Sequence, residues 1–313
     1  MGTIANNEWK PAPHVIIRNQ ELKAQIEGQG FSVQNLIPEK TIDALMAIFN
    51  KYHDIKNEKG GVFFSIFSQN LEYRKAIHED ISALLKPIIE PVFQNFKIVL
   101  NSFVIKISGE ESEFYIHQDT TSLDEWKYSP LSLWIPLQDV NESNGCLGIV
   151  PHSKHFFFPY RGLSFPSPID EIQSTIKHYL QPLKMKKGEA LMFDNRTLHH
   201  SYKNTSGKPR ISVICGIFPA EATVQTCNKP VSEFGGKVEV LEHDDSYLLT
   251  GKTFLSNNDK RPEEGKSIGW FDDPSFKIST EQFEHLCAKY NVVKNNVLSS
   301  SEPTKCNMIT EPV

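Results

Sequence analysis

The sequence predicts a mainly β protein with flanking helices, in which short strands form a sandwich or barrel. Eight short runs rich in β-branched and aromatic residues lie between about residues 97 and 219, with turn residues between them. These runs are too closely spaced for a parallel sheet, whose strands would alternate with crossover helices. The clearest helical patterns lie outside this stretch. Together these observations favour an antiparallel β core covered by helices.

Helical patterns precede, interrupt and follow the strands. Residues 41–52 carry apolar side chains at three- and four-residue spacing, which indicates an amphipathic helix. A second helix is predicted over 80–85, where Pro87 limits its continuation. Two more helices are predicted over 169–179 and 280–290.

The eight strands are predicted over residues 98–107, 113–117, 131–137, 146–150, 183–186, 190–193, 198–202 and 211–218. Two further segments stand out beside them. Residues 60–67 are apolar and fit either a lid over a substrate or, as the favoured interpretation, an edge strand of the core. The insertion 156–181, with three consecutive phenylalanines and Arg161, is a candidate wall of a pocket for a small organic acid.

We predict one domain over residues 1–294, with its β core at about 97–219, because a single β core without internal repeats is the simplest account of the chain. The tail, residues 295–313, is polar and rich in serine and threonine, so it is predicted to be disordered.

The composition limits the classes of function. The net charge of -5 argues against general binding to nucleic acid or to an anionic membrane. No apolar stretch approaches the length of a membrane span, and the N-terminus lacks the pattern of a secretory signal. The five cysteines are scattered, without a C-x-x-C pair, and are predicted to be reduced thiols. We therefore expect a cytoplasmic protein that acts on a small molecule.

The end of one predicted strand carries a candidate pair of metal ligands. In "FYIHQD", His117 and Asp119 are two residues apart, so a strand would direct both side chains to the same face, roughly 6 to 7 Å apart at the backbone. Both could then bind one metal ion from one side. The same spacing also occurs at ordinary surface strand ends, so other residues have to decide between the two interpretations.

A third ligand and a cation are found further along the chain. His199 and His200 are adjacent, so only one of them can face the interior of a barrel, and periodicity does not say which. A hairpin between the strands at 198–202 and 211–218 would place Arg210 opposite Ser201, where the guanidinium could bind a carboxylate. An ordinary hairpin with a solvated arginine is the alternative.

Two imidazoles and one carboxylate form the facial triad of non-haem Fe(II) oxygenases. On this combination the sequence resembles the phytanoyl-CoA dioxygenase-like family of Fe(II)/2-oxoglutarate-dependent dioxygenases. The resemblance covers about residues 98–219. It is carried by His117-Gln118-Asp119, by Trp134, by Asn144-Gly145-Cys146-Leu147 with Pro151, and by His199 with Ser201, Asn204, Ser206 and Arg210.

The resemblance implies a double-stranded β-helix, that is, a cupin-like jelly roll with the metal at its mouth. It implies that His117, Asp119 and His199 are the catalytic metal ligands, because the spacing of eleven residues to the arginine selects the first of the two histidines.

The resemblance also implies four residues that contact the co-substrate. Arg210 and Ser201 would bind the distal carboxylate of 2-oxoglutarate, and Trp134 and Lys106 would line its pocket.

One departure from the family pattern follows Pro151, where the chain reads Pro-His-Ser-Lys-His. His152 and His155 are expected to support the loop after the strand and not to bind metal.

The implied reaction is hydroxylation of a C–H bond in a small organic metabolite by an Fe(II) oxygenase that uses dioxygen and decarboxylates 2-oxoglutarate to succinate. Because Asp119 is a full carboxylate and not a small residue, halogenation is not expected. Two alternatives stay open. One is desaturation or cyclisation with the same cofactors, and the other is a metal cupin that does not use 2-oxoglutarate.

Overall fold

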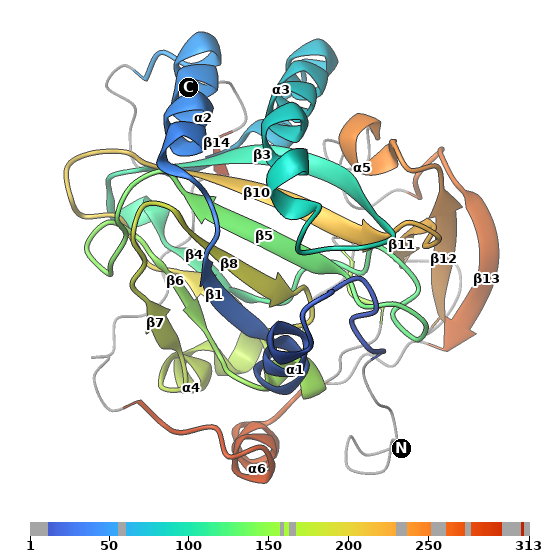
Figure 1. Cartoon of the computed structure of the whole chain (residues 1–313). Coiled ribbons are helices and arrows are strands. Elements are labelled where there is room, and N and C mark those ends of the chain that lie inside the picture. Colours follow the sequence, from blue (N-terminus) through green and yellow to red (C-terminus); the bar gives the residue numbers. More distant parts are fainter. Residues whose placement is uncertain are drawn as a thin grey trace.

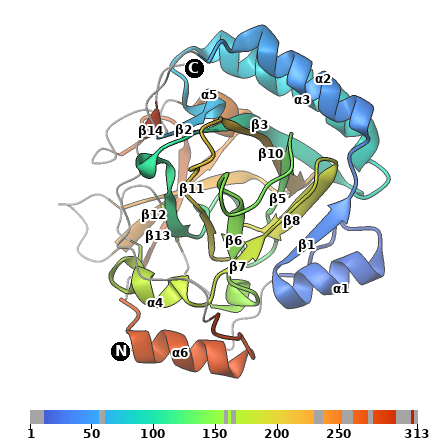
Figure 2. The same ribbon diagram turned by 90° about the vertical axis from the view of Figure 1, so that its left-hand side faces the viewer.

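The computed structural model describes residues 12–55, 61–156, 160–162, 167–229, 237–251, 261–272, 277–295 and 308–309. Its centre is a jelly roll of two facing sheets, seen side-on in Figure 1 and turned by 90° in Figure 2. The larger sheet consists, in spatial order, of β1 (Phe31–Asn35), β8 (Glu189–Asp194), β5 (Leu131–Pro136), β10 (Arg210–Pro219), β3 (Phe96–Ile107), β2 (Gly61–Phe64) and β14 (Met308–Ile309). The smaller sheet consists of β4 (Phe114–His117), β9 (His199–Ser201), β6 (Leu147–Ile149) and β7 (Gln181–Leu183).

The strand pairs of these two sheets are antiparallel except for β14 and β2, which are parallel. A third antiparallel sheet stands beside the jelly roll in Figure 1 and consists of β11 (Val224–Asn228), β12 (Lys237–His243) and β13 (Lys266–Asp272). The predicted fold class is therefore confirmed.

Period-two alternation in the larger sheet separates a helix-covered face from the barrel interior. On β3, Phe103 and Ile105 belong to the core beneath the helices, whereas Val104 and Lys106 line the interior cavity. On β10, Ile211 and the next alternate residues belong to the same outer core, which turns Arg210 inward. The alternate apolar residues of β10 pack beneath the helices, so the charged side chain of Arg210 points into the barrel interior.

Helices cover both outer faces of the jelly roll. Figures 1 and 2 show α2 (Glu39–Tyr52) and α3 (Leu71–Ile89) side by side over the larger sheet, and apolar residues of both helices form one core cluster with β3, β5 and β10. On the opposite side, α4 (Gln173–Lys177) and α6 (Thr280–Lys289) pack in a second cluster with Ile116 of β4. The helix α1 (Gln20–Gln29) packs beside β1 at one edge of the larger sheet, and the short helix α5 (Tyr247–Thr250) packs beside α3 and β3.

Most predicted elements are found within a few residues of their predicted bounds. Seven of the eight strands match closely, whereas the strand predicted over 183–186 is β7, which ends at Leu183. The helices predicted over 41–52, 169–179 and 280–290 correspond to α2, to α4 with a preceding 3-10 turn (Asp170–Ile172), and to α6. Residues 61–64 form β2 and pair with β3, so the favoured interpretation of this segment as a strand of the core is confirmed; β2 is not the edge of the sheet, because β14 pairs with its other side.

One predicted helix is too short. The helix predicted over 80–85 is α3, which begins after the N-cap Asn70 and continues through Pro87 to Ile89. A proline lacks the N–H that would bond the carbonyl four residues earlier, but here it lies in the last turn, so only the end of the helix is affected.

The predicted hairpin between 198–202 and 211–218 is wrong. β9 lies in the smaller sheet between β4 and β6, and β10 lies in the larger sheet between β5 and β3. The intervening segment crosses from one sheet to the other, and Arg210 pairs with Lys106 instead of Ser201. Turn residues such as Asn204 indicate that the chain changes direction, but they do not say in which sheet the next strand pairs.

The remaining predictions concern the termini, the thiols and the membrane. Cys146, Cys215, Cys227 and Cys287 are buried free thiols, and Cys306 lies outside the described residues. The predicted tail lies largely outside them as well, although Met308–Ile309 form β14. Within the described ranges, no helix is long and apolar enough to cross a membrane. The cytoplasmic location and the domain bounds stay predictions.

Candidate active site

A cavity of about 520 Å³, partly open to solvent, lies between the two sheets of the jelly roll. It contains all the residues that the sequence analysis assigned to the metal and to 2-oxoglutarate. Its lining consists of Val62, Phe64, Val104, Lys106, Phe114, His117, Asp119, Trp134, Leu147, Phe193, His199, His200, Ser201, Arg210 and Ile214. Apolar side chains therefore surround two polar groups, one on each sheet.

The first polar group is the His117, Asp119 and His199 cluster of the smaller sheet. β4 and β9 pair so that the two histidines are directly opposite each other, with ring centroids 4.2 Å apart. The Oδ1 atom of Asp119 lies 3.6 Å from Nε2 of His117 and 3.7 Å from Nε2 of His199. One nitrogen or oxygen atom from each residue lies within 4.8 Å of the others, and no other such group of three occurs in the described part of the chain.

Backbone contacts orient both imidazoles in the same way. Nδ1 of His117 lies 3.0 Å from the carbonyl oxygen of Tyr115, and Nδ1 of His199 lies 3.0 Å from that of Thr197. A carbonyl oxygen only accepts, so each Nδ1–H is the donor and each Nε2 presents a lone pair to the cluster. This arrangement fits the ligand set of a divalent metal ion.

The protonation states of the cluster also suit a metal. Burial, together with the neighbouring His117 ring, lowers the pKa of His199 to about 4, so this imidazole is neutral at pH 7. Burial alone would raise the pKa of Asp119, but the adjacent His199 and His117 lower it below its usual value. The cluster therefore offers a neutral His199 imidazole and the Asp119 carboxylate beside the ring of His117, which are the ligand types of the facial triad.

His200 faces away from the cluster. Its buried ring lies edge-on to that of Tyr202, and Nε2 is 3.3 Å from Oε1 of Glu113 without the alignment of a hydrogen bond. Glu113 also accepts a hydrogen bond from Nζ of Lys177 at 2.8 Å. His200 thus lies beside a partly buried ionic group, Glu113 and Lys177, behind β9.

This ionic group leads to a prediction about acid stability. Although burial opposes ionisation, His200 and Lys177 lower the pKa of Glu113 from 4.5 to about 2. A carboxyl group whose pKa is lower in the folded state stabilises the fold at any pH above its pKa in the unfolded state. This stabilisation is lost as the pH falls toward its pKa in the folded state. In urea unfolding, a Glu113→Gln variant should lose about 2 kcal/mol less stability than the parent between about pH 6 and about pH 3. Equal losses in both proteins would contradict the role of Glu113.

The second polar group is centred on Arg210, whose side chain is 1% exposed. It donates to the hydroxyls of Ser212 at 2.6 Å and Ser201 at 3.4 Å, and its guanidinium lies 5.3 Å from the ring centre of Trp134. Nε has no hydrogen-bond partner among the described residues. Burial lowers the pKa of Arg210 to about 10, so it is still a cation at pH 7.

A buried cation with an unpaired N–H is costly unless an anion binds beside it. The Arg210 environment therefore fits the carboxylate of a co-substrate.

Lys106 lies beside Arg210 on the neighbouring strand, but its ammonium group has other partners. Nζ donates to the carbonyl oxygens of Ser112 (2.6 Å), Ser201 (3.1 Å) and Tyr202 (2.7 Å). It thereby fastens β9 to β3 across the barrel. A direct contact between Lys106 and 2-oxoglutarate, as the family resemblance implies, stays a prediction and would compete with these bonds.

Lys106 also explains the glycine of the Asn-Gly-Cys-Leu motif. Gly145 has a φ of 80°, and a Cβ there would lie 2.5 Å from Cδ of Lys106.

His152 and His155 lie outside the cavity lining. Nδ1 of His152 contacts the carbonyl oxygen of Gly28 at 2.9 Å, and Nε2 of His155 contacts the same oxygen at 3.3 Å. The ring of His155 stacks on Tyr290. Both contacts hold the loop after β6 against α1, in agreement with the expected structural role.

Arg161 does not line the cavity. It forms a bidentate ion pair with the buried carboxylate of Glu125 and donates from Nε to the backbone oxygen of Asp119 at 2.6 Å. The expectation that it binds an organic acid is therefore not supported. Of the three phenylalanines nearby, Phe156 is buried in a core cluster, and the other two lie outside the described residues.

Sequence reasoning missed the apolar wall of the cavity and the support behind the cluster. Phe64, Phe114 and Ile214 line the cavity, but strand alternation alone does not say which face of a strand meets a ligand. Asp194 and Arg196, which are fully buried, directly follow the apolar run at 190–193, just before His199. Two opposite charges in that position were the available signal.

A family model described as phytanoyl-CoA dioxygenase (PhyH) matches residues 35–212, which is more than half of the chain. The chain belongs to the phytanoyl-CoA dioxygenase family. Membership agrees with the resemblance of the motifs and confirms the predicted class, Fe(II)/2-oxoglutarate-dependent dioxygenases that use dioxygen. The matched range contains every residue predicted to bind the metal or 2-oxoglutarate.

Curated relatives from other organisms are similar to part of the chain. Phytanoyl-CoA dioxygenase 1 of Oryza sativa subsp. japonica is 26% identical over 132 residues, which are 40% of this chain and 45% of the relative. Phytanoyl-CoA dioxygenase domain-containing protein 1 of Danio rerio is 28% identical over 145 residues, which are 44% of this chain and 48% of the relative. The chain thus spans about half the length of the curated relatives that it matches.

Solved structures are similar at lower identity. HygX from Streptomyces hygroscopicus, with nickel, 2-oxoglutarate and hygromycin B bound, has a TM-score of 0.47 at 13% identity and covers 65% of this chain and 88% of its own. The α-ketoglutarate-dependent epimerase SnoN from nogalamycin biosynthesis has a TM-score of 0.47 at 16% identity and covers 79% of this chain and 92% of its own.

Proposed function

We propose that this member of the phytanoyl-CoA dioxygenase family hydroxylates a C–H bond of a small organic metabolite, with decarboxylation of 2-oxoglutarate to succinate. One observation carries the proposal. A cluster with the composition of a facial triad and a buried arginine with an unpaired N–H line one cavity. A metal-binding jelly roll that does not use 2-oxoglutarate has no need for such an arginine.

In this proposal His117, Asp119 and His199 hold Fe(II). Their donor set matches the facial triad, and their Nε2 and Oδ1 atoms already converge. When bound, Fe(II) with 2-oxoglutarate and dioxygen supplies the oxidant for C–H chemistry. In the overall reaction one atom of dioxygen enters the product and the other enters succinate, while carbon dioxide leaves.

Arg210 and Trp134 of the larger sheet, with Ser201 of the smaller sheet, would bind the co-substrate. Arg210 would pair with its distal carboxylate, with the Ser201 hydroxyl as a second donor and Trp134 as an apolar side wall. Because these side chains are buried, water competes weakly for the carboxylate. Lys106 would keep Ser201 in place through the backbone of β9.

The cavity walls support a small, largely apolar substrate. Phe64 and Phe114 lie 5.6 Å apart between ring centres, and Phe114 lies 5.0 Å from the ring of His117, so an aromatic surface borders the proposed metal site. A nucleic acid would need a basic groove, and the net charge of the chain is -5.

The test has two stages. With Fe(II), ascorbate and 2-oxoglutarate, the protein should release succinate even before its substrate is known. Incubation with metabolite extracts should then yield a product heavier by one oxygen atom, detected by mass spectrometry. Succinate with a product lighter by two hydrogens would change the reaction to desaturation or cyclisation. No succinate under any of these conditions would refute the proposal.

A further inference from the structure

The turn between β8 and β9 contacts both halves of the candidate metal cluster. We call residues 194–197 the triad turn. On the β4 side, Asp119 donates its backbone N–H to the carbonyl oxygen of Asn195 at 2.9 Å, and Gln118 donates its side-chain amide to the next carbonyl oxygen. On the β9 side, Nδ1 of His199 donates to the carbonyl oxygen two residues earlier, at 3.0 Å. Three consecutive carbonyl oxygens of one turn thus hold two sequence segments that are about 80 residues apart in the chain.

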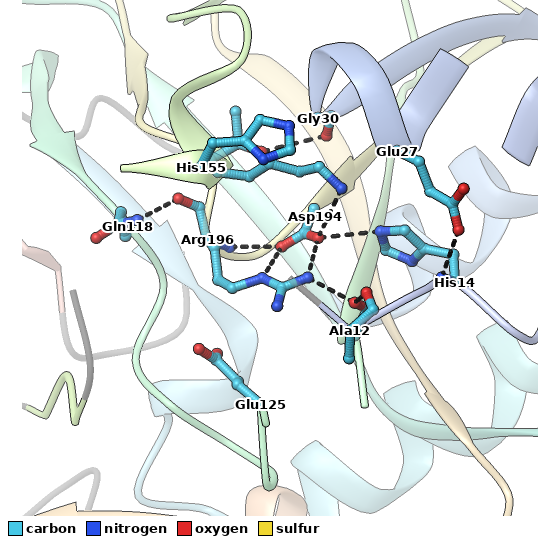
Figure 3. Close-up of polar contacts among 12 residues, drawn as sticks. Ala12, His14, Glu27, Gly30, Gln118, Glu125, His155, Asp194 and Arg196 are labelled. Carbon is cyan, nitrogen blue, oxygen red and sulfur yellow. Dashed lines mark hydrogen bonds and ion pairs between the residues drawn. The ribbon is translucent and has the colours of Figure 1, made fainter. Parts of the chain in front are cut away.

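A buried ionic network in turn holds the triad turn, as Figure 3 shows. The carboxylate of Asp194 accepts hydrogen bonds from the backbone N–H of Arg196 at 3.0 Å and from its Nε at 2.8 Å, with a second guanidinium nitrogen on the other oxygen. Nε2 of His14 lies 3.0 Å from Oδ2, and Nζ of Lys154 lies 3.8 Å from it.

The network resists displacement because its members are out of contact with water. Asp194 and Arg196 are both fully buried. Burial opposes ionisation of Asp194, but Arg196 and His14 hold its pKa well below the usual range. Separating a buried bidentate pair strands two charges, so the lowest-energy arrangement of the turn is narrowly defined.

We propose that Gln118 and the Asp194–Arg196 pair are positioning residues of the metal site, which set the distance between the two ligand-bearing segments through the triad turn. The inference rests on the proposed function, because it concerns the ligands assigned there. None of these side chains lies in the cavity lining, so they would act on the metal only through the backbone and through the ligands.

The test measures Fe(II) affinity directly, by anaerobic titration calorimetry. Gln118→Leu removes the side-chain bond to the turn without stranding a charge, and it should weaken Fe(II) binding about 10-fold, as loss of an outer contact to metal ligands does. Arg196→Lys keeps the charge but loses the two-point geometry and should weaken binding at least as much. Gln34→Leu, which removes another amide hydrogen bond on β1, is the matched control and should bind as the parent does.

Thermal unfolding of the same samples distinguishes positioning from general destabilisation. If Gln118→Leu is folded and binds Fe(II) as tightly as the parent, the inference is refuted, whatever Arg196→Lys does. A lowered midpoint of unfolding with unchanged Fe(II) affinity in Arg196→Lys would also contradict it. A parent protein that binds no Fe(II) would instead refute the proposed function, so the two failures can be told apart.

Discussion

Each of the three single variants His117→Ala, Asp119→Ala and His199→Ala should abolish succinate formation. These residues supply the only three donors that converge in the described part of the cavity. A site that has lost one of three protein ligands cannot keep the facial arrangement that leaves the remaining positions for 2-oxoglutarate and dioxygen. We expect each variant to bind Fe(II) at least 10-fold more weakly than the parent, as measured by anaerobic titration, while its circular dichroism spectrum is unchanged.

His200→Ala is the matched control for this prediction. It removes an imidazole that is adjacent in sequence to His199 and is also buried, but that ring contacts Glu113 and Tyr202 instead of the cluster. The variant should lose stability and keep its Fe(II) affinity. If His200→Ala lost the metal and His199→Ala retained it, the assignment of the third ligand would be wrong.

Arg210→Ala should raise the concentration of 2-oxoglutarate needed for half-maximal succinate formation by about two to four orders of magnitude. Removing one partner of a buried charge pair costs about 3–5 kcal/mol, much of which comes from the charge left behind. Fe(II) affinity should change little, because Arg210 lies on the larger sheet and the cluster on the smaller one. Arg210→Lys should give a smaller increase, since it keeps the charge without the two-point geometry.

Arg74→Ala tests whether loss of any buried arginine has this effect. Arg74 of α3 is 4% exposed and donates to three backbone carbonyl oxygens away from the cavity. Its removal should lower the midpoint of thermal unfolding without changing the 2-oxoglutarate requirement. An unchanged requirement in Arg210→Ala would remove the main support for this co-substrate.

The local parts of the fold could be predicted from the sequence, whereas the pairing between sheets could not. Alternation identified β3, β5 and β10, and the period of apolar residues identified α2. The hairpin prediction failed because β9 and β10 are close in sequence but belong to different sheets. The third sheet of β11, β12 and β13 was missed, since its alternation is weak and its outer strand is mostly exposed.

The residues of the candidate site could be predicted from sequence motifs, whereas the triad turn that supports them could not. The spacing of His117 and Asp119 on one strand end suggested the first two ligands, and the family resemblance, with eleven residues from His199 to Arg210, named the others that the structure brings into one cavity. Arg210 meets Ser201 across the barrel and not across a hairpin, so the expected proximity arises from a different topology. The triad turn depends on contacts from distant segments that contain His14, Gln118 and Lys154, and no local pattern encodes such contacts.

Anaerobic calorimetric titration with Fe(II) and 2-oxoglutarate, added in either order, tests the central claim most directly. One Fe(II) should bind per chain, and 2-oxoglutarate should bind much more tightly once the metal is present. The metal held by the triad would then bind one end of 2-oxoglutarate while Arg210 binds the other. By reciprocity, 2-oxoglutarate should raise the affinity for Fe(II) by the same factor. Binding of 2-oxoglutarate that is equally tight with and without metal, or no Fe(II) binding to the intact chain, would contradict the claim.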